Sequence, residues 1–96
     1  PVKEAAAVKA RAEGTAQWVL RMALPLWAHH ARQGNRAAPE RLACFALMMR
    51  CCSDVMLRGA LHAHFSDDER SEGGVLCTEL QHDLDRLALE KVLAKC

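Results

Sequence analysis

Hydrophobic residues recur along the chain mostly three and four positions apart, which is the spacing of one face of an α-helix. In the first such stretch Trp18, Met22 and Leu26 follow one another at intervals of four, and the stripe is widened by Leu20, Leu24 and Trp27 or Ala28. The pattern predicts a first helix over about residues 2–33, with these side chains on its packed face. Pro25 lacks the amide hydrogen that the helical ladder needs, so we expect a kink or a break there.

The second helix is predicted over about residues 39–65, because Pro39 suits the first position of a helix. Its N-terminal half is apolar on every side, and a helix of that kind must be covered all round. One short chain offers too few partner helices, so the pattern predicts a homodimer built on this helix. Small or flexible side chains at helical spacing mark the expected interface: Cys52, Met56, Gly59, Ala60 and Ala63.

The acidic, glycine-containing stretch 66–74 is the one clear linker of the chain. A third helix is predicted over about residues 75–95. Its inner face is expected to carry the apolar positions Leu76, Leu80, Leu84, Leu87 or Ala88, and Val92. Its outer face is expected to carry the charged positions Glu79, Asp83, Asp85, Arg86 and Glu90.

Composition agrees with an all-α fold. Hydrophobic residues make up 51% of the 96 positions, but aromatic residues only 4%, and tyrosine is absent. Alanine, leucine and methionine are strong helix formers, whereas strands favour β-branched and aromatic side chains. The sequence therefore predicts a single helical domain over residues 1–96, a bundle of three main helices completed by homodimerisation.

Charge is distributed unevenly along the chain. Residues 1–65 contain nine Lys/Arg and four Asp/Glu, a formal charge of +5, and residues 66–96 carry −4. This asymmetry favours pairing of the last helix with the first two, within one chain or across a dimer. It argues only mildly for nucleic acid or an anionic membrane as a partner.

The five cysteines are expected to be reduced, because their number is odd and three of them lie inside a predicted helix. We therefore predict a cytoplasmic protein. The longest apolar run, residues 42–49, is far shorter than the roughly 20 residues that span a bilayer. No membrane partner is expected.

The most informative polar feature is a line at four-residue spacing on the second predicted helix: Arg50, Asp54, Arg58 and His62. The line has two interpretations. Asp54 could bridge the two arginines on a solvated surface, which is a common and weak stabilising arrangement. Alternatively the two guanidinium groups could bind a partner or an anionic ligand, since their planar donors suit carboxylates and phosphates.

The spacing of the histidines and the length of the second predicted helix disfavour metal binding and DNA binding. His62 and His64 are two positions apart and point away from each other on a helix, so they do not form a metal pair with Cys77 or His82. We predict no metal, no cofactor and no catalytic residue. A DNA-binding helix-turn-helix would need two short helices, and the second predicted helix is too long and too apolar.

By elimination, the chain is predicted to be a small non-enzymatic regulatory or adaptor protein. It would act by docking a helical surface onto another protein and would also bind a second copy of itself. Two alternatives remain open. One is a DNA-associated regulator, and the other is a helical bundle that binds a small anionic ligand and could be an enzyme.

Overall fold

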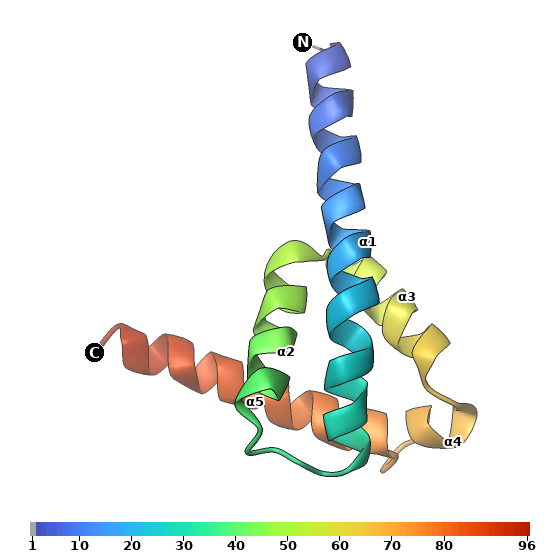
Figure 1. The fold of residues 1–96 in the computed structure, drawn as a ribbon. Helices are drawn as coiled ribbons and strands as arrows, with labels where there is room; N and C mark the ends of the chain where they lie inside the picture. Colours follow the sequence, from blue (N-terminus) through green and yellow to red (C-terminus); the bar gives the residue numbers. More distant parts are fainter. Residues whose placement is uncertain (1) are drawn as a thin grey trace.

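The computed structural model describes residues 2–96, and every regular element in that range is a helix (Figure 1). Pro1 lies outside the described residues. The prediction of an all-α chain is confirmed, although five helices are present rather than three. Their bounds are α1 Val2–Arg32, α2 Pro39–Cys51, α3 Asp54–His64, α4 Asp67–Arg70 and α5 Val75–Ala94.

The lower half of α1 forms the centre of the molecule, with α2 and α3 packed against it and α5 crossing below (Figure 1). The N-terminal half of α1 extends away from this body. The C-terminal end of α5 also extends beyond it, past α2 (Figure 1). Both projecting ends leave helical surface without cover from the described chain.

Helix α1 runs through Pro25 without a break. Pro25 is exposed, so the carbonyl group of Arg21 that loses its donor lies on the side of the helix that faces water. Gly34 ends the helix with φ of 65°. The amide of Asn35 donates to the carbonyl oxygen of His30 at 3.0 Å, which is the bond of a Schellman C-cap.

The predicted second helix is two helices, because Ser53 starts a new one. Residues Cys52 and Ser53 are extended, and the Ser53 hydroxyl accepts a hydrogen bond from the amide of Met56 at 3.2 Å. Serine is among the preferred N-cap residues, since its side chain satisfies an amide that has no partner within the helix. The expectation of one helix over residues 39–65 is therefore wrong at this position.

The predicted linker 66–74 contains the one-turn helix α4. Ser66 and Glu69 form a reciprocal capping box at its start. After it, a Cβ atom at Gly74 would lie 2.5 Å from the carbonyl oxygen of Glu69, so only glycine fits this turn. The linker is thus a compact connection between α3 and α5.

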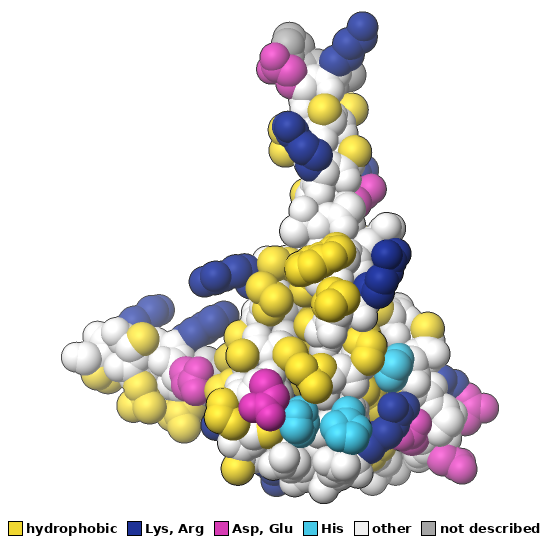
Figure 2. All heavy atoms as spheres, in the orientation of Figure 1, with side chains coloured by type: hydrophobic (Ala, Val, Ile, Leu, Met, Phe, Trp, Pro, Cys, Tyr) yellow, Lys and Arg dark blue, Asp and Glu magenta, His cyan; other side chains and the backbone are white. Residues whose placement is uncertain are grey.

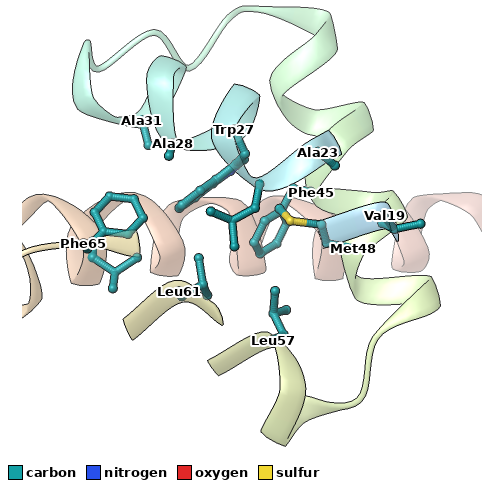
Figure 3. Close-up of a cluster of buried hydrophobic side chains, with 12 residues drawn as sticks. Val19, Ala23, Trp27, Ala28, Ala31, Phe45, Met48, Leu57, Leu61 and Phe65 are labelled. Carbon is teal, nitrogen blue, oxygen red and sulfur yellow. The ribbon is translucent and has the colours of Figure 1, made fainter. Parts of the chain in front are cut away.

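The core is centred on Trp27, which is fully buried between Phe45 of α2 and Phe65 that follows α3 (Figure 3). The ring centroids lie 5.6 and 6.1 Å from that of Trp27. Smaller apolar side chains from four helices complete the cluster: Val19, Ala23, Leu24, Ala28, Ala31, Met48, Leu57, Leu61 and Leu76. Burying these groups supplies the main driving force for folding.

A buried ion pair lies beside this aromatic cluster. Arg41 and Asp83 are both fully buried, and the Arg41 Nε atom donates to Asp83 Oδ2 at 2.9 Å. The same oxygen accepts a hydrogen bond from Trp27 Nε1 at 2.7 Å. One aspartate therefore joins α1, α2 and α5.

Glu79 extends the cluster toward the surface. It accepts from Arg41 Nη1 at 2.9 Å and from Arg36 Nη2 at 2.7 Å. The hydrogen bond from Arg36 is the main reason why the pKa of Glu79 lies below its ordinary value. The expectation that Glu79 and Asp83 line the outside of α5 is wrong, because both carboxylates face the core and are matched by arginines there.

A second ion pair, between Arg32 and Glu69, ties the end of α1 to α4. The Arg32 Nε atom lies 2.8 Å from Glu69 Oε2, and Arg32 also donates to the carbonyl oxygen of His64 at 3.0 Å. Arg32 and the amide of Ser66 together lower the pKa of Glu69 to about 2. The capping box and the ion pair thus stabilise the same ionised carboxylate.

Replacing Arg41 with Met is expected to destabilise the protein by about 3–5 kcal/mol, because Asp83 would remain buried without its counter-ion. The measurement is the free energy of unfolding in urea. Arg11→Met, in the exposed part of α1, is the matched control and should change stability little. The double variant Arg41→Met/Asp83→Leu should recover part of the loss, and a double variant no more stable than the single one would contradict the role given to the buried charge.

Glu69→Gln is expected to lower the thermal midpoint at neutral pH, and the difference from wild type should disappear in acid. Because the pKa of Glu69 is held below its ordinary value, the stabilisation is present above about pH 4.5. It is lost as the pH falls toward about 2. Glu72→Gln is the control, since Glu72 is exposed and outside the capping box. Equal pH dependence in both variants would contradict this assignment.

Candidate functional site

Two adjoining hollows run along one side of α5 and form the most prominent candidate site of the described chain. The first lies between α2 and α5 and measures about 570 Å³. The second lies between α3 and α5 and measures about 420 Å³. Met49 and Leu84 line both, so we treat them as one groove, the α5 groove, which follows α5 from Leu76 to Lys91.

The floor of the α5 groove is apolar. Its leucines and methionine come from three helices: Leu47 and Met49 of α2, Leu57 and Leu61 of α3, and Leu76, Leu80, Leu84 and Leu87 of α5. The side chains of Leu80, Leu84 and Leu87 are only half-buried, because Glu79 and Asp83 turn the neighbouring face of α5 into the core. The packed face of α5 is therefore rotated from the one that the leucine spacing predicts.

The rim of the α5 groove is mainly cationic. Arg50 and Lys91 lie at one end, and Arg58 and Arg70 at the other. The imidazole of His62 and the carboxylate of Asp54 also line the second hollow. Arg70 already donates to the carbonyl oxygens of His62 and Phe65 and pairs with Asp67, so its role there is to cap α3. Arg50 and Arg58 are exposed on this rim, and Arg58 lies near Asp54.

The predicted polar line is thus brought to one groove, although not on one helix. Asp54, Arg58 and His62 lie on α3 and line the second hollow, whereas Arg50 lies at the end of α2 and lines the first. Arg58 Nη2 is 3.7 Å from Asp54 Oδ2, and both side chains are more than three-quarters exposed. This geometry is that of a solvated surface pair, and the pair borders the second hollow.

The five residues predicted for a dimer interface lie in different surroundings. Cys52 faces α1, where its Sγ atom is 3.7 Å from the carbonyl oxygen of Ala16. Ala60 packs against the core, and Ala63 lines a shallow hollow between α3 and α1. Met56 is half-buried, and Gly59 is open to solvent.

A second apolar surface lies on α1, where the spacing of Trp18, Met22 and Leu26 predicts a packed face. These side chains are exposed instead. The residues expected only to widen the stripe, Leu24 and Trp27 or Ala28, are the ones that lie in the core. In Figure 2 hydrophobic side chains gather along the middle of α1, on the face toward the viewer. The four-residue spacing indicates an apolar stripe on α1, but spacing alone does not say whether other helices cover that stripe.

Two of the five cysteine thiols are poorly suited to act as nucleophiles. All five cysteines are free. Burial raises the pKa of the Cys44 and Cys52 thiols, which disfavours the thiolate at neutral pH. Among the described residues no three His, Cys, Asp or Glu side chains are grouped so that they could hold a metal ion. Within the same range, no helix combines the length and the apolar character needed to cross a bilayer.

Comparison of the chain with family models, with curated proteins and with solved structures finds no match. The chemistry of the α5 groove therefore carries the functional argument.

Proposed function

We propose that the chain is a small non-enzymatic adaptor that binds an amphipathic helix of another protein in the α5 groove. The observation that carries the proposal is the apolar floor formed by half-buried leucines of α5, with cations at both ends of the groove. A helix laid into a groove through its apolar face is a recurring mode of protein recognition. The groove follows α5 over about 20 Å, which accommodates roughly four turns of a partner helix.

The rim selects the charge of that helix. Arg50, Arg58 and Lys91 border the groove, and among the described residues that line it Asp54 alone is a carboxylate. A partner with acidic residues beside its leucine face would pair with these cations, whereas basic residues would be repelled. The proposed occupant is therefore an acidic amphipathic helix rather than an apolar segment of any charge.

The two alternative functions find less support. The division into α2 and α3 removes the objection that the second helix is too long for a helix-turn-helix. However, α3 begins with Asp54 and is followed by Asp67 and Asp68, and these carboxylates would repel a phosphate backbone. A small anion would find Arg58 at the groove, but its partner Asp54 and the wide apolar floor suit a larger, amphipathic ligand.

The Arg50→Gln/Arg58→Gln double variant is expected to weaken binding of an acidic helix about tenfold, because two rim cations are removed. The probes are two synthetic 18-residue helical peptides with the same leucine face, one flanked by Glu and one by Lys. Fluorescence anisotropy should show binding of the Glu-flanked peptide only. The free energy of unfolding of the variant should differ from that of the wild type by at most about 1 kcal/mol, since both arginines are exposed.

Arg11→Gln/Arg21→Gln is the matched control, because it removes the same charge from α1, away from the groove. It should bind the Glu-flanked peptide as wild type does. Equal affinity for both peptides, or no loss in the Arg50/Arg58 variant, would contradict the proposal. Tighter binding of a short DNA duplex, lost in the same variant, would instead support a DNA-associated regulator.

A further inference from the structure

The two hollows of the α5 groove differ in how far they reach into the molecule. Leu57 and Leu61, at the base of the second hollow, are 5 and 2% exposed and belong to the core cluster (Figure 3). Leu76 completes this base and is buried as well. Among the described residues that line the first hollow none is buried, and two are the alanines Ala43 and Ala46. The second hollow therefore reaches the core, whereas the first is a trough in the surface.

We propose that the second hollow takes one tryptophan side chain of the partner helix, and that this side chain is the main anchor of the helix in the groove. The inference rests on the function proposed above, because it requires a helix bound in the α5 groove. It adds the kind of side chain that the partner carries and the place where that side chain binds. The trough beside Ala43 and Ala46 takes the smaller side chains of the same helix face.

The size of the second hollow favours a side chain larger than leucine. The hollow measures about 420 Å³, and pockets that enclose a whole small molecule measure roughly 300–1,000 Å³. A leucine would leave part of the buried base without contacts, and unfilled space loses dispersion energy. Tryptophan is among the residues that most often dominate binding when they fill a pocket of a partner protein.

The mouth of the second hollow suits the polar edge of an indole ring. Asp54 and Arg58 line it, and both side chains are more than three-quarters exposed. Arg58 Nη2 is 3.7 Å from Asp54 Oδ2, which is longer than a hydrogen bond, so this oxygen can accept from an indole N–H. The Arg58 guanidinium can also lie over the face of an aromatic ring. A ring with an apolar body and one N–H matches the leucine base and the charged mouth together.

The wall of the second hollow toward α4 is held in place by hydrogen bonds within the chain. Arg70 donates to the carbonyl oxygens of His62 and Phe65. The Cys77 thiol in turn donates to the carbonyl oxygen of Arg70 at 3.4 Å. Arg70, His62 and Cys77 all line the hollow. Because this wall is already formed, a side chain that enters has less conformational entropy to offset.

The first experiment measures binding of Glu-flanked 18-residue helical peptides by fluorescence anisotropy, with each leucine of the apolar face replaced in turn by Trp or Ala. At one position the Trp peptide should bind about tenfold more tightly than the leucine peptide, and the Ala peptide about tenfold more weakly. At the other positions the affinities should stay within about threefold. Leucine as tight as tryptophan at every position would overturn this inference and leave the proposed function standing. No binding by any peptide would overturn both.

Two substitutions on α5 assign that position to the second hollow. Leu80 lines only the second hollow and Leu87 only the first, and both side chains are half-buried. Leu80→Trp places a ring of the chain itself in the second hollow, so the Trp and Ala peptides should bind this variant alike. Leu87→Trp is the matched control and should keep the preference for the Trp peptide. A preference that survives Leu80→Trp would overturn the inference.

Alkylation by iodoacetamide locates the anchor in the wild-type protein, so it does not require Leu80→Trp to fold. Cys77 is exposed and lines the second hollow, whereas Cys96 is exposed and lines neither hollow. The Trp peptide at saturation should slow modification of Cys77 and leave that of Cys96 unchanged, as read by mass spectrometry. An unprotected Cys77 would overturn the inference. Displacement of the Trp peptide by an equal concentration of decanoate would also overturn it, because the hollow would then belong to a small amphipathic anion.

Discussion

The buried pair of Arg41 and Asp83 is the constraint on which the arrangement of α5 depends. A charge taken out of water is costly unless it is paired and hydrogen-bonded, and here Trp27 and Arg41 both donate to one carboxylate oxygen. Rotating α5 by one residue would turn Asp83 away from Trp27 and Arg41 and leave the Arg41 guanidinium buried without this carboxylate. The pair therefore selects a single rotation of α5 against α1 and α2, whatever its net contribution to stability.

The α5 groove is a consequence of that selection. With Glu79 and Asp83 turned inward, the leucines at positions 80, 84 and 87 lie beside the core rather than in its centre. They are covered on one side by α2 and α3 and remain open on the other. A polar interaction in the core thus leaves a row of apolar side chains at the surface, and these side chains form the floor of the proposed binding site.

The sequence predicted where the helices lie better than it predicted which face of each helix is buried. The ends of α1 and α4 follow from local chemistry, Gly34 in one case and the Ser66–Glu69 capping box in the other. The break before α3 had a local signal too, Ser53 followed by an acidic residue, but the long apolar run concealed it. The faces of α1 and α5 depend on contacts between residues more than 40 positions apart, such as Arg41 with Asp83, and no periodicity along one helix contains that information.

The same reasoning explains how the four residues of the polar line come to border the α5 groove. Four-residue spacing places Asp54, Arg58 and His62 on one side of α3, and that remains true although Arg50 belongs to another helix. Arg50 reaches the same groove because α2 and α3 both border α5, so tertiary packing replaces the helical register that the sequence suggested. The cations are brought together by α5, whose own orientation is set by the buried pair.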